Sequence, residues 1–85
     1  AVVGAGGALA YPGTGNYIYA LGGSSSVAFE RYDIVNNVWV SMIDVPATVG
    51  AGGSLVYPGS GDYIYGLIGD NSTSFKRYDI VNNLW

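Results

Sequence analysis

The sequence predicts an all-β protein made of two similar four-stranded antiparallel sheets, and three observations support this fold class. Residues 1–39 and 47–85 align without a gap, with 26 identical pairs in 39 positions. Short segments rich in Tyr, Val, Ile, Phe and Trp alternate with clusters of Gly, Pro, Asn and Ser, as in strands joined by tight turns. No segment shows the 3.6-residue apolar spacing of an amphipathic helix.

Four strands are expected in the first repeat, at residues 6–11, 16–21, 27–34 and 38–43. The segments between them carry a Pro-Gly-Thr-Gly cluster, a Gly-Gly doublet with a serine run, and an Asn-Asn pair, all typical of turns. In the strand at 16–21, residues of both parities are apolar, so both faces of the sheet are expected to be covered. Such a sheet lies between two others.

The repeat has a period of 46 residues, which is typical of stacked units that cannot bury their apolar faces alone. Small sheets stacked face to face occur in the radial array of a β-propeller. We therefore expect two propeller blades, residues 1–46 and residues 47–85. The second blade lacks the counterparts of residues 40–46, so its fourth strand is expected to be truncated.

A truncated sheet and a low blade number both point to association. An open edge strand recruits another chain, and closed propellers use roughly four to eight blades. We expect the ring or array to be completed by further copies of the chain or by further repeats of a longer chain.

A glycine doublet, a Tyr-Asp pair and a Trp recur at fixed spacings in the two repeats. The motif residues are Gly22, Gly23, Tyr32, Asp33 and Trp39 in the first repeat, and Gly69, Tyr78, Asp79 and Trp85 in the second. This pattern resembles the kelch family of propeller repeats, although Ile68 replaces the first glycine of the second doublet. The resemblance implies four-stranded blades in which the Tyr and Trp side chains pack between neighbouring blades.

The composition argues against an enzyme and against a bound cofactor or metal. The chain has no Cys and no His, which removes the commonest nucleophiles and transition-metal ligands. Galactose-oxidase-like relatives of kelch propellers hold copper through His and Tyr. Because this chain has no His, no such copper site is expected. The Asp-Ile-Val-Asn-Asn runs that begin at Asp33 and Asp79 could bind calcium or cap turns, and one carboxylate per run favours the turn.

Charge and hydropathy exclude two further classes of partner. Three basic residues stand against six acidic ones, for a net charge of −3, so no nucleic acid is expected. No apolar run is long enough for a membrane span. The Lys-poor surface, rich in Ser, Thr, Tyr and Gly, favours an extracellular or cell-surface location and leaves the cytoplasm open. Asn71 begins an Asn-Ser-Thr triplet and is a candidate N-glycosylation site.

Two functions remain. The first is a non-enzymatic structural module that self-assembles into a closed propeller or an extracellular filament, with other copies of itself as partners. The second is a ligand-binding propeller domain of a larger secreted protein, which recognises a glycan or a protein. Tyr11 and Tyr57, beside the Pro-Gly turns, are the best-placed residues for a ligand-binding rim. Arg31 and Arg77 either grip a ligand carboxylate or pair with neighbouring acidic residues.

Overall fold

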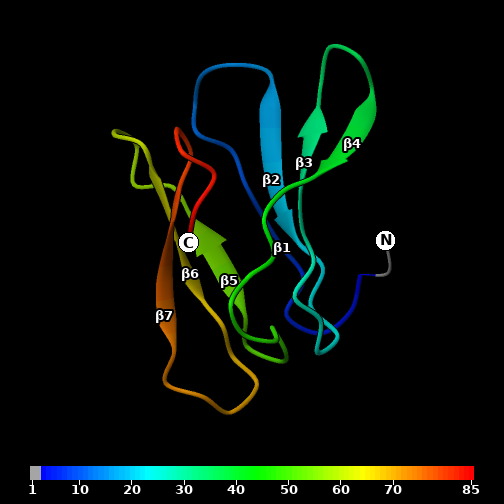
Figure 1. The fold of residues 1–85 in the computed structure, drawn as a ribbon, viewed down its shortest axis with the longest axis vertical. Coiled ribbons are helices and arrows are strands. Elements are labelled where there is room, and N and C mark those ends of the chain that lie inside the picture. The colour runs from blue at the N-terminus through cyan, green and yellow to red at the C-terminus, as the bar shows by residue number, and fades with distance from the viewer. Residues whose placement is uncertain (1–2) are drawn as a thin grey trace.

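The computed structural model describes residues 3–85, which form seven strands in two antiparallel sheets and no helix (Figure 1). The predicted all-β class is confirmed. The first sheet has the order β1-β2-β3-β4, and the second has the order β5-β6-β7. The strands are β1 (Ala8–Ala10), β2 (Tyr17–Leu21), β3 (Phe29–Asp33), β4 (Val38–Ser41), β5 (Ser54–Val56), β6 (Tyr63–Leu67) and β7 (Phe75–Asp79).

All four strands predicted in the first repeat are present, and each is shorter than expected. The first strand is predicted at 6–11 and observed at Ala8–Ala10. Gly6 has a φ of 88°, a left-handed value that does not fit a strand. The glycines before β1 therefore form a turn, and the strand begins after them.

The strand register of the first sheet recurs 46 residues later in the second sheet. The fourth strand is the exception. In the first sheet Asp33 pairs with Val38 at the start of β4. At the equivalent place in the second sheet, Asp79 forms one antiparallel bridge with Leu84. The second sheet thus has three strands and a single bridge where a fourth strand would start.

The glycine doublet has one position that requires glycine and one that does not. Gly23 and Gly69 have φ values of 68° and 69°. A Cβ on Gly23 would lie 2.5 Å from the carbonyl oxygen of Ala5, and a Cβ on Gly69 would meet the oxygen of Ala51 at the same distance. The first position tolerates a side chain, because Ile68 occupies it in the second repeat and is buried.

The hydrophobic core lies between the two sheets, which stand side by side in Figure 1. Its centre is an aromatic cluster drawn from both sheets. The ring of Phe29, from β3, lies edge-on to Tyr78 and Trp85 of the second repeat, with centroid distances of 4.6 and 4.9 Å. The buried core residues are Ala10, Tyr19, Leu21, Phe29, Val45, Val49, Ile64, Ile68 and Tyr78.

Replacing Phe29 by Ala is expected to lower the free energy of unfolding by about 3–5 kcal/mol, because a buried aromatic ring is lost from the joint between the sheets. Phe75 occupies the same position of the second repeat and is 62% exposed, whereas Phe29 is 1% exposed. Phe75→Ala is therefore the matched control, with an expected loss below about 1 kcal/mol. Urea unfolding followed by circular dichroism, at high dilution, measures both. Equal losses would contradict the assignment of Phe29 to a shared core.

Candidate association surfaces

The two faces of each sheet carry different side chains, because successive residues of a strand point to opposite faces. We call one face the Phe face. Its residues are Tyr17, Tyr19, Leu21, Phe29 and Arg31 in the first sheet, and Tyr63, Tyr65, Leu67, Phe75 and Arg77 in the second. We call the other face the Trp face. Its residues are Ile18, Ala20, Glu30, Tyr32 and Trp39 in the first sheet, and Ile64, Gly66, Lys76, Tyr78 and Trp85 in the second.

The internal interface joins the Phe face of the first sheet to the Trp face of the second. Besides the Phe29 contacts, the rings of Tyr19 and Tyr78 lie 5.7 Å apart. Polar contacts frame the aromatic cluster. The indole Nε1 of Trp85 donates to the carbonyl oxygen of Ile43 at 3.4 Å, and the Ile43 amide donates to Asn83 Oδ1 at 3.3 Å. The motif residues Tyr78 and Trp85 therefore pack against the neighbouring sheet.

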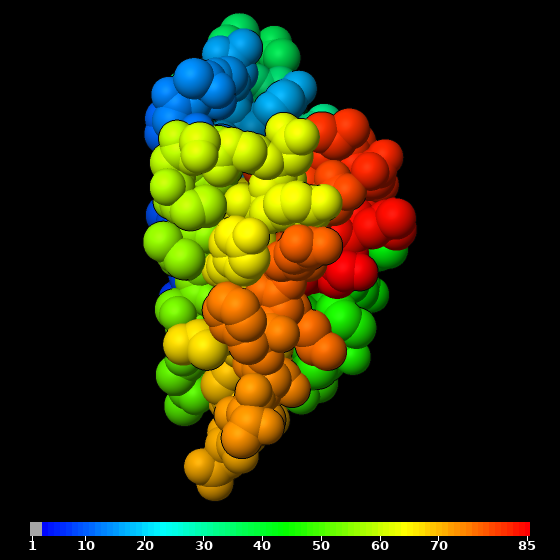
Figure 2. All heavy atoms as spheres, turned by 90° about the vertical axis from the view of Figure 1, so that its left-hand side faces the viewer, coloured from blue at the N-terminus to red at the C-terminus, as the bar shows by residue number. Residues whose placement is uncertain are grey.

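The outer Phe face, on the second sheet, is uncovered within the described residues. Leu67 is 50% exposed, whereas its counterpart Leu21 in the internal interface is 1% exposed. Figure 2 shows this side of the molecule, where β6 and β7, in yellow and orange, lie at the surface. The Tyr65 and Phe75 rings stack at 5.9 Å, the same distance as their counterparts Tyr19 and Phe29. The face thus keeps the shape of its buried counterpart.

The outer Trp face, on the first sheet, is also open. Trp39 is 55% exposed, and its ring lies 5.1 Å from that of Tyr32. Their counterparts Tyr78 and Trp85 lie 5.3 Å apart. The motif residues Tyr32 and Trp39 are therefore arranged as in the internal interface, without a sheet packed on them.

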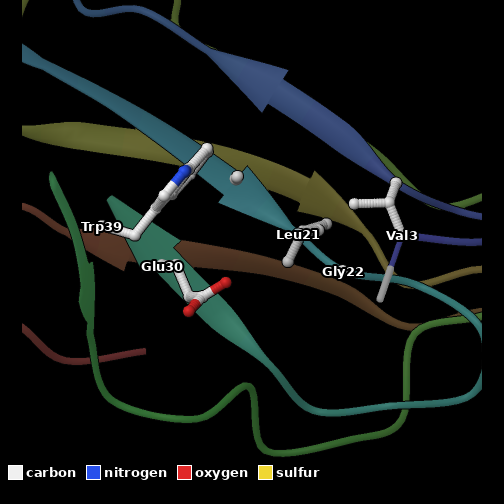
Figure 3. A pocket seen from close by; sticks show the side chains of 6 residues that line it. Val3, Leu21, Gly22, Glu30 and Trp39 are labelled. Atoms are coloured by element: carbon white, nitrogen blue, oxygen red, sulfur yellow. The ribbon is translucent and has the colours of Figure 1, made fainter. Parts of the chain in front are cut away.

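A pocket of about 180 Å³ lies on the outer Trp face. Figure 3 shows Trp39 and Val3 at opposite ends of the pocket, Leu21 between them and Glu30 on the side of Trp39. An adjoining hollow of about 490 Å³ extends along β1 and has walls that are almost entirely apolar. The pocket, which Gly22 also lines, is an apolar opening beside the exposed indole.

The carboxylates of the Asp-Ile-Val-Asn-Asn runs serve their own turns. Asp33 Oδ1 accepts from the amides of Val35 and Asn36, at 3.0 and 3.1 Å, and Oδ2 accepts from Asn36 Nδ2 at 2.8 Å. Asp79 makes the same three bonds in the second repeat. Bonds from the side chain and backbone of Asn36 hold the pKa of Asp33 below its usual range, and Asn82 does the same for Asp79. This geometry favours turn capping over calcium binding.

The tyrosines predicted for a binding rim brace the loops beside them. The Tyr11 hydroxyl donates to the carbonyl oxygen of Gly15 at 3.1 Å, and the Tyr57 hydroxyl donates to that of Gly61 at 2.7 Å. Tyr57 also lines a pocket of about 180 Å³ where the two sheets meet. Tyr11 does not belong to that pocket. Its residues are Pro12, Thr14, Tyr17, Tyr19, Tyr57, Gly61, Asp62 and Ile80.

Arg31 and Arg77 stack on tyrosines of the adjacent strand of their own sheet. The guanidinium carbons lie 3.9 Å from the ring centroid of Tyr17 and 4.2 Å from that of Tyr63. Neither predicted role, a carboxylate grip or an ion pair, is needed to explain their placement. Cation–π stacking holds each guanidinium flat against the Phe face.

Asn71 lies in the exposed loop between β6 and β7, with a left-handed φ of 61°. The Ser72 hydroxyl next to it donates to the carbonyl oxygen of Gly69 at 2.8 Å. The candidate glycosylation site is therefore accessible on a compact loop.

The residues that the sequence predicts for a site do not include Phe29 and Phe75, which dominate the two Phe faces. One signal was present: Phe is identical at this position in both repeats, within segments whose flanking residues differ. This identity does not say which residues the Phe ring contacts, because only the fold brings Phe29 to Trp85.

No known protein-family model matches the chain, and no curated protein matches its sequence. No helix that could cross a membrane occurs in residues 3–85.

The buried phenol of Tyr78 makes stability depend on pH in the alkaline range. Burial raises the pKa of Tyr78 to about 12, against about 10 in an unfolded chain. Because the folded state favours the protonated phenol, its contribution is complete below about pH 10 and is lost as pH rises through about 12. We expect the loss to be on the order of 2 kcal/mol.

Urea unfolding at several pH values between about 9 and 12 measures this loss. Tyr78→Phe removes the ionisable group and is expected to flatten the pH dependence, with a constant offset for the lost hydroxyl bond to Asn83 Oδ1. Tyr32→Phe, at the same position of the first repeat, is the control and keeps the wild-type slope. A wild-type slope in Tyr78→Phe would contradict the prediction.

Proposed function

We propose that this chain is a non-enzymatic structural repeat module: two kelch-like propeller blades whose outer faces associate with further blades. These belong to other copies of the chain or to further repeats, and the product is a closed propeller or an extracellular filament. One observation carries the proposal. The two faces joined in the internal interface recur as the two uncovered outer faces, with the same aromatic pairs at nearly the same spacing.

The uncovered side chains provide a driving force for association. Burying a large apolar side chain contributes about 1.5–3 kcal/mol, and Leu67, Phe75 and Trp39 are each at least half exposed. All five side chains of the Phe face are identical in the two sheets. The Phe face of the first sheet packs against the second sheet. The second sheet therefore presents an identical set of side chains that has no partner among the described residues.

Four polar side chains at equivalent positions of the two repeats support a structural role over catalysis. The carboxylates of Asp33 and Asp79 accept three hydrogen bonds each from their own turns. The hydroxyls of Tyr11 and Tyr57 are similarly engaged with loop carbonyls. Side chains held in this way stabilise loops, and they are poor candidates for proton transfer to a substrate.

Phe75→Asp is expected to weaken association, because it places a charge on the apolar part of the outer Phe face. Light scattering coupled to size-exclusion chromatography, from micromolar to millimolar concentration, should show oligomers of the wild-type chain and the 8.8 kDa monomer of the variant. Val81→Asp is the matched control, because Val81 is 71% exposed in a turn outside both faces. A wild-type chain that stays monomeric throughout would contradict association between copies of the chain.

A ligand-binding propeller domain is the second candidate, favoured by the pocket between the sheets. The pocket combines the aromatic rings of Tyr17 and Tyr57 with the polar groups of Thr14 and Asp62, a lining suited to a sugar.

If the pocket binds a glycan, Tyr57→Ala should reduce binding on a glycan array at least tenfold, because the aromatic wall is lost. Tyr11→Ala is the control: it removes the equivalent loop brace outside the pocket. Equal binding by both variants and the wild-type chain would rule out the pocket as the site.

A further inference from the structure

The two outer faces are different from each other, and this difference determines how copies can meet. The internal interface joins one Phe face to one Trp face, and the molecule leaves one of each uncovered. A contact between two Phe faces, or between two Trp faces, has no counterpart within the chain. A contact between the outer Phe face of one molecule and the outer Trp face of another repeats the internal interface.

We propose that a second copy of this chain is the partner, and that it docks head-to-tail with its Trp face on the outer Phe face. Phe75 of the first molecule enters the pocket beside Trp39 of the second copy. The proposal rests on the proposed function, because it presumes association through these faces. It adds the partner, the polarity of the contact and the residue at its centre.

The aromatic contacts of the internal interface predict those between copies. Phe29 lies edge-on to both Tyr78 and Trp85. The counterpart of Phe29 is Phe75, which projects from the outer Phe face and is 62% exposed. If the contact between copies repeats the internal interface, Phe75 of one molecule lies against Tyr32 and Trp39 of the next.

The receiving site is preformed. Tyr32 and Trp39 hold nearly the same ring spacing as their covered counterparts, and the pocket in Figure 3 opens directly beside Trp39. In the internal interface, the place beside Trp85 is filled by Phe29. The pocket beside Trp39 is therefore the uncovered equivalent of an occupied site.

The backbone near the start of each repeat supports the same polarity. Gly6 lies so close to the next repeat that a Cβ on it would collide with the carbonyl oxygen of Gly50. Gly52 is the counterpart of Gly6 and has a φ of 90°, but a Cβ there would meet only the Cα of Gly69, at 3.9 Å. The open space beside Gly52 is where Gly4 of the second copy, the counterpart of Gly50, would lie.

Charge also favours unlike faces. The outer Phe face carries Arg77 and the outer Trp face carries Glu30, which are opposite in sign. In the internal interface the corresponding residues are Arg31 and Lys76, which have the same sign. Docking of unlike faces would bring Arg77 of one molecule and Glu30 of the next to one interface.

The contact between copies is expected to be weaker than the internal interface. Ile68 is buried on the Trp face of the second sheet, whereas its counterpart Gly22 lines an open pocket. Less apolar surface is therefore buried between copies, and the contact also costs translational freedom. Copies should separate on dilution while each chain stays folded.

Two single-face variants test the proposal. Phe75→Asp disrupts the outer Phe face and leaves the Trp face intact, and Trp39→Asp does the reverse. Each variant alone should remain at 8.8 kDa, and an equimolar mixture should form a 1:1 heterodimer of twice that mass. Native mass spectrometry with one variant isotopically labelled identifies the heterodimer. The double variant Phe75→Asp with Trp39→Asp lacks both faces, and mixed with either single variant it is the control for nonspecific association.

The outcomes separate this proposal from the proposed function. If the wild-type chain forms oligomers but the mixture stays monomeric, head-to-tail docking is wrong and association through the faces stands. If Trp39→Asp alone still dimerises, the contact joins like faces and the proposal is overturned. If the wild-type chain is monomeric at all concentrations, head-to-tail docking is wrong, and so is the association between copies in the proposed function. Should an aspartate variant lose its β-sheet circular dichroism, Phe75→Ser and Trp39→Gln provide the same comparison.

Discussion

The edge-on packing of Phe29 against Tyr78 and Trp85 holds this molecule together. Each sheet has only three or four short strands, too few to bury an apolar face by itself. The aromatic cluster lets the Phe face of the first sheet serve as the core of the second, and the polar contacts of Ile43 with Asn83 and Trp85 link the two sheets. Without that cluster, neither sheet has a second apolar layer.

The same constraint explains why the surface is unfinished. A sheet with two apolar faces needs a neighbouring sheet on each face. In a molecule of two sheets, each sheet has only one neighbour, so one face of each stays uncovered. The uncovered faces are left with Phe75 on one side and Trp39 on the other, both exposed and both arranged as in the covered interface. Function in this molecule is therefore proposed at these two uncovered surfaces.

The sequence predicted the strand content well, because period, turn residues and β-branched or aromatic segments are local signals. The four strands of the first repeat and their antiparallel order follow from that pattern. The direction of stacking could not be predicted, since the repeat alone does not say which face of β3 meets the next sheet. The pocket beside Trp39 was missed for the same reason. The resemblance to kelch repeats stays a prediction, although the structure explains why Ile68 can replace a glycine of the doublet and Gly69 cannot be replaced.

The pairing of unlike faces is tested most directly by isotope-filtered nuclear Overhauser spectroscopy on an equimolar mixture of labelled and unlabelled wild-type chain, at a concentration where copies associate. Cross-peaks between the Phe75 ring of one molecule and the Trp39 indole of another are expected. Intermolecular cross-peaks between two Phe75 rings, with none to Trp39, would contradict this packing.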